Sequence, residues 1–156
     1  MNPSSEISHV KRREIQAPIA ACLIRGFARE MGLDRAIEVA TAAIQADGME
    51  AGKEMAGRYG GNSMAELGCV VREVWSEDEG LVIENLEETA DSLSFDVTRC
   101  GYAEMYEKLD MKDLGVCLSC CRDAPFAKGF NPRMRLIRTQ TLMEGGSLCD
   151  FRFVLE

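Results

Sequence analysis

The apolar residues of this chain change their spacing close to Gly80. Before Gly80 they recur every three or four positions, which is the period of an amphipathic helix. After Gly80, apolar and polar residues alternate, which is the period of a strand with one buried face. A helical first half followed by strands indicates an α+β protein, in which helices cover one face of an antiparallel sheet.

The first half is predicted to contain three helices, after a polar segment at residues 1–8 that is expected to be loose. The first helix begins near His9 and ends at Gly32, and the second continues to about Tyr59. The third follows a break at residues 60–63. An apolar stripe of the kind that helices bury marks the first helix, at Ile15, Ile19, Cys22, Leu23, Phe27 and Met31.

The second half is predicted to form two antiparallel hairpins joined by two short helices, over residues 102–109 and 114–128. The whole chain is then one domain, with a helical half over residues 9–79 packed on a sheet half over residues 80–156. The first predicted hairpin pairs residues 81–87 with 92–99, and the second pairs residues 133–143 with 148–155.

Charge and composition narrow the classes of partner. The net charge of −8 argues against nucleic acid, because phosphate binding needs a basic surface. A small anionic ligand held by a few local arginines remains compatible with it. No apolar run approaches the ~20 residues that cross a bilayer, and the N-terminus carries no apolar signal segment. We therefore expect a cytoplasmic protein with a small-molecule ligand and no membrane partner.

Two arginines fall on strand faces that also carry the alternate apolar residues, namely Arg99 and Arg138. An inward-facing arginine needs an anionic partner, because an unpaired buried charge is costly. The partners are either Asp123, Glu104 and Asp150 in an internal ion-pair network, or the carboxylate of a substrate, which a guanidinium fork fits well.

Three of the seven cysteines lie where separate elements are expected to meet: Cys100, Cys120 and Cys149. An odd number of cysteines argues against a disulfide framework. We predict that the three thiols line one pocket with Asp123 at its rim. They could hold a divalent metal such as zinc, or one could be a nucleophile with a lowered pKa, or all three could simply be packed separately.

His9 is the single histidine and lies in a polar N-terminal segment, so a Ser-His-Asp triad is not expected. A catalytic base would then be a carboxylate, with Asp123 and Glu104 as candidates, or a metal-bound water.

Five ordered motifs resemble those of the L-2-amino-thiazoline-4-carboxylic acid hydrolase family, and Arg12–Ala17 resembles the opening of that family. The motifs are Thr-Arg-Cys-Gly-Tyr-Ala-Glu-Met-Tyr at 98–106, Leu-Ser-Cys-Cys-Arg-Asp at 118–123, Gly-Phe-Asn-Pro at 129–132, Arg-Thr-Gln-Thr-Leu-Met-Glu-Gly at 138–145 and Cys-Asp-Phe-Arg-Phe at 149–153. The layout also resembles 4-vinyl-reductase-type domains, which share a fold with nitric-oxide sensors and vesicle-trafficking-particle subunits.

The family resemblance implies a hydrolase that opens a carboxylated sulfur-nitrogen ring to N-carbamoyl-L-cysteine. Arg138 would hold the ring carboxylate. The remaining candidates are Cys120, Asp123 and Glu104 for catalysis, Arg99 and Asn131 for further substrate contacts, and Cys100, Cys120 and Cys149 for a metal. The alternative is a non-catalytic small-molecule-binding or metal-sensing module. A homo-oligomer is a further expectation.

Overall fold

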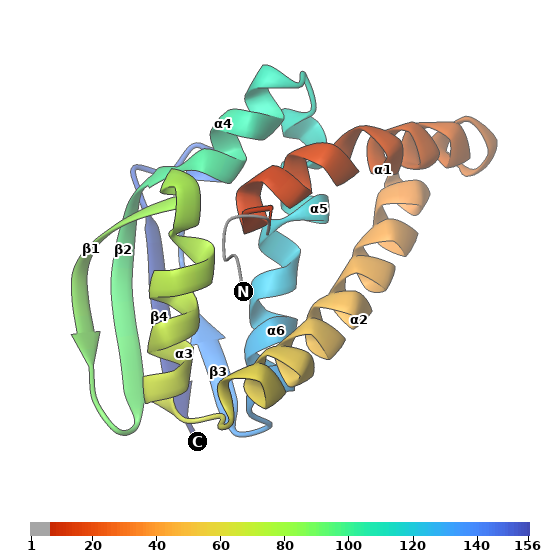
Figure 1. Cartoon of the computed structure of the whole chain (residues 1–156). Helices are drawn as coiled ribbons and strands as arrows, with labels where there is room; N and C mark the ends of the chain where they lie inside the picture. Colours follow the sequence, from red (N-terminus) through yellow and green to blue (C-terminus); the bar gives the residue numbers. More distant parts are fainter. Residues whose placement is uncertain (1–6) are drawn as a thin grey trace.

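The change of period at Gly80 coincides with the boundary between helices and strands in the structure, a computed structural model that describes residues 7–156 (Figure 1). The α-helices are α1 (His9–Met31), α2 (Leu33–Tyr59), α3 (Met64–Val70), α4 (Gly101–Lys108), α5 (Gly115–Leu118) and α6 (Asp123–Phe130). The strands are β1 (Leu81–Glu88), β2 (Ser92–Cys100), β3 (Met134–Ile137) and β4 (Cys149–Leu155). The α+β prediction is confirmed.

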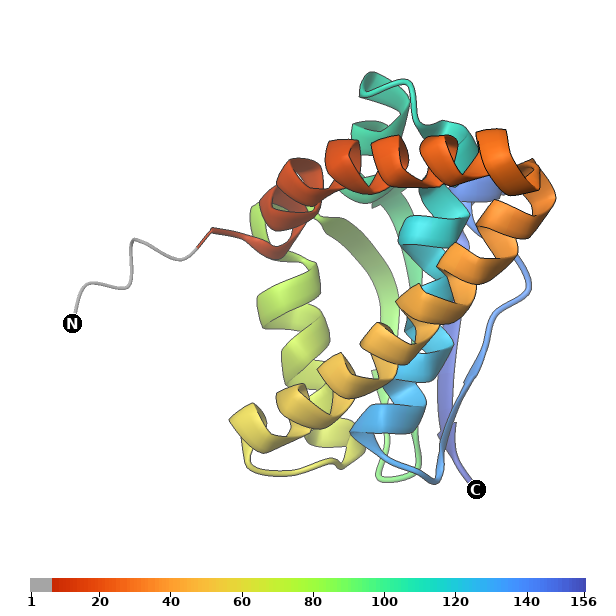
Figure 2. The same cartoon turned by 90° about the vertical axis from the view of Figure 1, so that its right-hand side faces the viewer.

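The four strands form one antiparallel sheet in the order β1-β2-β4-β3. Both predicted hairpins are present, and they join side by side through β2 and β4. Phe95 lies opposite Phe151 across this central pair, and their rings stack with centroids 4.9 Å apart. The helices lie on one face of the sheet, with α1 and α2 in the outermost part of the helical layer (Figures 1 and 2).

Aromatic residues form the contact between the sheet and the helices. Trp75 ends a turn of π-helix over Val71–Trp75 that continues α3, and its ring lies 5.3 Å from that of Phe126 on α6. The same ring lies 6.3 Å from the rings of Phe151 and Phe153 on β4. Burial of such large apolar surfaces is the main stabilising contribution in a core of this kind.

The large apolar stripe of α1 faces outward, so the expectation that this face is buried was wrong. Its large apolar members are 45–64% exposed. Cys22 is exposed with them. The buried face instead carries Ala17, Ala21 and Ile24. Small side chains let α1 lie close to its neighbours, but alanine adds little to a hydrophobic pattern, so the larger residues dominated the sequence signal.

Adjacent residues of α1 should therefore differ sharply in their effect on stability. Replacing Ile24, which is 5% exposed, with alanine is expected to lower the free energy of unfolding by about 2–4 kcal/mol. Replacing Leu23, which is 53% exposed, with glutamine is expected to change it by less than about 0.5 kcal/mol. Urea unfolding of both variants measures the difference, and equal losses would contradict the observed orientation of α1.

The predicted strand at residues 133–143 ends at Ile137. Beyond it, the backbone N–H groups of Thr139 and Gln140 both donate to Asp150 Oδ1 at 2.9 Å. A side-chain carboxylate thus takes the donors that a strand ladder would use. A 3₁₀ turn over Leu142–Glu144 follows, and the chain re-enters the sheet as β4.

The helix predicted over residues 114–128 is interrupted at Ser119. The separate helix α6 begins at Asp123, which places Pro125 in its first turn. Proline lacks an N–H and clashes with the carbonyl four residues earlier, so a continuous helix through Cys121 is disfavoured.

Near the N-terminus, Ser8 is buried and its Oγ accepts the N–H of Lys11, so the prediction of a loose segment is wrong there. Residues 1–6 of that segment lie outside the described residues.

Candidate functional site

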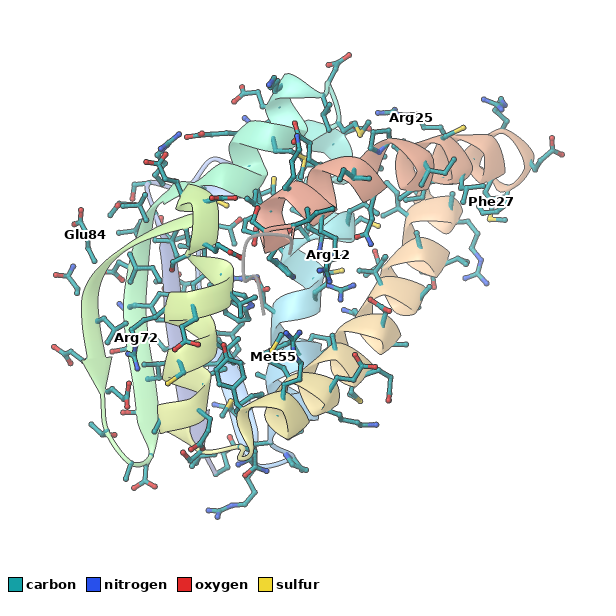
Figure 3. All side chains as sticks on the ribbon, in the orientation of Figure 1. Arg12, Arg25, Phe27, Met55, Arg72 and Glu84 are labelled. Atoms are coloured by element: carbon teal, nitrogen blue, oxygen red, sulfur yellow. The ribbon has the colours of Figure 1, made fainter. Side chains whose placement is uncertain are left out.

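A cavity of about 110 Å³ lies between the sheet and the helices. Its apolar wall comes from α2, α6, the π-turn and the sheet, and Figure 3 shows Met55 reaching from α2 toward α3. The apolar lining residues are Ala51, Met55, Trp75, Leu81, Phe126, Met143 and Phe151. The polar lining residues are His9, Arg13, Cys100, Tyr102, Ser119, Cys120, Arg122, Asp123, Arg138 and Cys149.

Arg138 and Asp123 form an ion pair in this cavity. Arg138 Nη1 donates to Asp123 Oδ2 at 2.5 Å, and the two side chains are only 15% and 24% exposed. Arg138 also donates to the Cys120 carbonyl oxygen at 3.2 Å and lies 5.0 Å from the centre of the Phe151 ring. Burial raises the pKa of the Asp123 carboxyl, and the charge of Arg138 opposes that rise. Asp123 is therefore a buried carboxylate with a proton affinity above its ordinary value.

Cys100, Cys120 and Cys149 all line the cavity with Asp123. Burial raises the pKa of the Cys100 thiol to about 11, and it also raises the pKa values of Cys120 and Cys149. All three sulfurs are thus protonated thiols near neutral pH. Two of them accept backbone N–H groups, Cys100 from Ala103 and Cys149 from Leu142, at 3.4 and 3.2 Å.

The donor set does not fit a metal. Throughout residues 7–156, no three His, Cys, Asp or Glu side chains are grouped so that they could hold an ion. Thiols with raised pKa values are also poor ligands, because the thiolate is the form that binds metal. The zinc hypothesis for Cys100, Cys120 and Cys149 therefore gains no support.

His9 lines the cavity, although its position in a polar N-terminal segment gave no indication that it would belong to the site. His9 Nδ1 lies 2.7 Å from the hydroxyl oxygen of Tyr102. Burial and the charges of Arg13, Arg122 and Arg12 lower the pKa of His9 to about 4. The imidazole is therefore neutral near pH 7 and can donate or accept one hydrogen bond at each nitrogen.

Arg13 and Arg122 also reach the cavity, from α1 and from the turn before α6. Arg122 donates to Asp47 at 2.5 Å. Arg13 donates to the neutral amide oxygen of Gln16 at 3.1 Å, and burial followed by the charge of Arg122 lowers its pKa. Within the described chain, no carboxylate lies close enough to Arg13 to form a salt bridge.

The sequence did carry a signal for these missed residues. His9 and Arg13 are four residues apart, so they share one face of the predicted first helix. Tyr102 and Arg122 lie inside the motifs that resemble the hydrolase family. The charged character of this segment hid the face that His9 and Arg13 share.

Arg99 and Glu104 lie outside the cavity, so the expectation that Arg99 points inward was wrong. Val97 pairs with Ile83 and Arg99 with Val82, which leaves Thr98 as an extra residue in β2. One extra residue turns every later side chain to the opposite face. Arg99 therefore faces solvent and binds Glu104 at 2.6 Å, whereas Cys100 turns inward.

Asn131 does not line the cavity. It ends α6, donates to the Asn62 carbonyl oxygen at 3.0 Å and accepts the N–H of Arg133 at 2.9 Å. These bonds hold the turn between α6 and β3. Of the candidate catalytic and substrate-binding residues, the structure brings together Cys120, Asp123 and Arg138, and it separates Glu104, Arg99 and Asn131 from them.

The family model for L-2-amino-thiazoline-4-carboxylic acid hydrolase matches residues 12–153. The chain belongs to this family. The match begins at Arg12 inside α1, includes Arg13, and ends at Phe153 inside the last strand. No curated protein matches the chain.

Solved structures with a similar fold belong to proteins of other kinds. Subunit 3 of the trafficking protein particle complex from Naegleria fowleri, covalently bound to palmitic acid, matches with a TM-score of 0.54 at 10% identity, covering 93% of this chain and 95% of that one. The phenol-responsive sensory domain of the transcription activator PoxR, solved with phenol, matches with a TM-score of 0.52 at 12% identity, covering 89% and 73%. These likenesses confirm the predicted sensor-type fold.

None of the helices in residues 7–156 combines the length and the apolar character that crossing a membrane requires.

Proposed function

We propose that this protein hydrolyses a small carboxylated sulfur-nitrogen ring of the 2-amino-thiazoline type, with Asp123 as the group that moves the proton. Family membership supports hydrolysis of that class. The observation that carries the proposal is a buried carboxylate with a raised pKa in a cavity of about 110 Å³ with an apolar wall.

In the proposed reaction, water attacks the amidine-like carbon between the ring sulfur and the ring nitrogen. The Asp123 carboxylate accepts a proton from that water as the new carbon–oxygen bond forms. The carbon–sulfur bond then breaks, the sulfur leaves with the bonding pair, and the proton on Asp123 passes to it. The remaining proton of the added hydroxyl moves to the former ring nitrogen, which converts that carbon–oxygen bond into the carbonyl of the carbamoyl group. The product carries a free thiol and a carbamoyl group, so one water is consumed and no other reactant is needed.

Arg138 is proposed to hold Asp123 in position and to keep the carboxylate partly ionised. It is therefore a positioning residue, and the earlier assignment of Arg138 to the ring carboxylate gives way to this role. Cys120 is proposed to line the ring site as a protonated thiol. A nucleophilic thiolate would first have to lose its proton against a raised pKa.

The test is turnover of 2-amino-thiazoline-4-carboxylate by the purified protein, with the carbamoyl product detected by mass spectrometry. We expect product with the wild-type protein. We expect Cys120→Ser to retain activity within about tenfold, because a serine hydroxyl can replace a thiol that only lines the site but is a far weaker nucleophile. Loss of activity by about a thousandfold or more in Cys120→Ser would instead favour covalent catalysis.

A non-catalytic small-molecule-binding module is the second candidate. The apolar and aromatic wall of the cavity favours it, since such walls are typical of binding sites for small ligands. Tight binding of the ring without any product over long incubation would support this candidate against the hydrolase. The predicted homo-oligomer and the predicted cytoplasmic location stay predictions.

A further inference from the structure

We propose that Arg13, with Arg122 beside it, forms the subsite that binds the carboxylate of the ligand. The proposal deepens the proposed function and rests on it for the identity of the ring. It does not rest on turnover, because a subsite for an anion can be tested by binding alone.

Charge balance around the cavity singles out Arg13. Three arginines line it, and two of them have carboxylate partners, since Asp123 binds Arg138 and Asp47 binds Arg122. Asp123 is the one acidic residue among the described lining residues. Among the described residues, Arg13 donates only to the amide oxygen of Gln16, and the charges of Asp47 and Asp123 act on it only from beyond salt-bridge distance, so its positive charge has no direct counter-charge. A ligand with one carboxylate would neutralise it.

Arg138 is the poorer candidate for this role. Its guanidinium already donates to Asp123 and to the Cys120 carbonyl oxygen. A ligand carboxylate placed there would have to approach the Asp123 carboxylate, and two like charges at close range disfavour each other. Binding at Arg13 avoids this repulsion and leaves Asp123 free to act on the ring.

The surroundings of Arg13 suit an anion. Arg122 lines the same cavity, and although Asp47 pairs with one of its nitrogens, its guanidinium still lowers the pKa of Arg13. His9 lies one helical turn before Arg13 on α1, is neutral and is joined to the Tyr102 hydroxyl, so both groups offer hydrogen bonds without adding negative charge. A guanidinium in such surroundings can bind a carboxylate through two parallel N–H···O hydrogen bonds.

The same arrangement predicts a cost in the ligand-free protein. Arg13 is half-buried beside another guanidinium, and like charges in a partly desolvated site destabilise the fold. Removal of the Arg13 charge should therefore leave the ligand-free protein at least as stable as wild type while it weakens binding. Such opposite effects are typical of a residue that serves binding and not folding.

The test compares 2-oxothiazolidine-4-carboxylate with 2-oxothiazolidine, two rings that differ only in the carboxylate, by titration calorimetry. The variant is Arg13→Gln, and the control is Arg29→Gln, the same charge change at an exposed position on the same helix. We expect the wild-type protein and the control to prefer the carboxylated ring. We expect Arg13→Gln to lose about 10- to 100-fold of that preference, with unchanged affinity for the uncharged ring and an unchanged or higher Tm.

An Arg13→Gln protein that keeps the full preference would overturn the subsite, and so would a wild-type protein with no preference for the carboxylated ring. A preference that depends on Arg13, in a protein that never turns over the thiazoline, would support the subsite and overturn only the proposed hydrolysis. Failure of the carboxylate subsite and failure of the proposed hydrolysis therefore give different results.

Discussion

Replacing Asp123 with asparagine is expected to lower kcat for ring hydrolysis by about 10²–10⁴-fold, the range attributed to a positioned acid or base. Asparagine keeps the shape of the side chain but cannot accept the proton of the attacking water. The same change should lower the free energy of unfolding by about 3–5 kcal/mol, because it leaves the guanidinium of Arg138 buried without a counter-charge. Product formation and urea unfolding measure the two effects.

A paired replacement separates catalysis from stability. The double variant Asp123→Leu with Arg138→Met removes both charges and fills a similar volume. Because well-packed apolar residues often replace a buried ion pair at little cost, we expect the double variant to regain most of the lost stability. It should remain inactive. A stable double variant with wild-type turnover would show that Asp123 takes no part in the chemistry.

Replacing Gly52 or Gly129 with alanine is expected to destabilise the protein by about 3 kcal/mol, at the upper end of overpacking costs. A methyl group at Gly52 would overlap the carbonyl oxygen of Phe126, and one at Gly129 would overlap that of Met49. Both clashes are with backbone, which cannot move aside as a flexible side chain can. Since α6 carries Asp123, displacement of α6 from α2 should also reduce turnover.

Gly57 is the matched control for this prediction. It lies in the same helix as Gly52, but a methyl group there would meet nothing within 4 Å. Alanine at Gly57 should therefore raise the free energy of unfolding by about 0.5–1 kcal/mol, because glycine is a poor helix former. Equal stabilities of Gly52→Ala and Gly57→Ala in urea would contradict the close approach of α2 and α6.

Local patterns were enough to predict the fold class and the two hairpins, whereas the pairing of β2 with β4 was not predicted. The period of the apolar residues depends only on whether the backbone is helical or extended, so the boundary at Gly80 could be read directly. The same patterns, together with the family motifs, placed Arg138 and Cys149 on inward faces, and both residues line the cavity.

The remaining parts of the site depended on contacts between distant segments. An extra residue at Thr98 turned Arg99 outward and Cys100 inward, and such a bulge arises from pairing with β1 and leaves no mark in the alternation of β2 itself. The buried face of α1 was decided by how closely its alanines let it approach other helices, which a count of apolar residues does not measure.

The sequence alone determined which half of the chain is helical and which half forms the sheet, because periodicity and turn residues act within a few positions of one another. The end of β3 at Ile137 depended on a contact with Asp150. Only the tertiary structure decided which charges meet. Asp123 pairs with Arg138, which is 15 positions away in the sequence, and Arg122 pairs with Asp47, which is 75 positions away. Arg13, at the same cavity, donates to the amide oxygen of Gln16. Charge pairing depends on distance in space and on burial, and neither can be read from the order of residues in a chain.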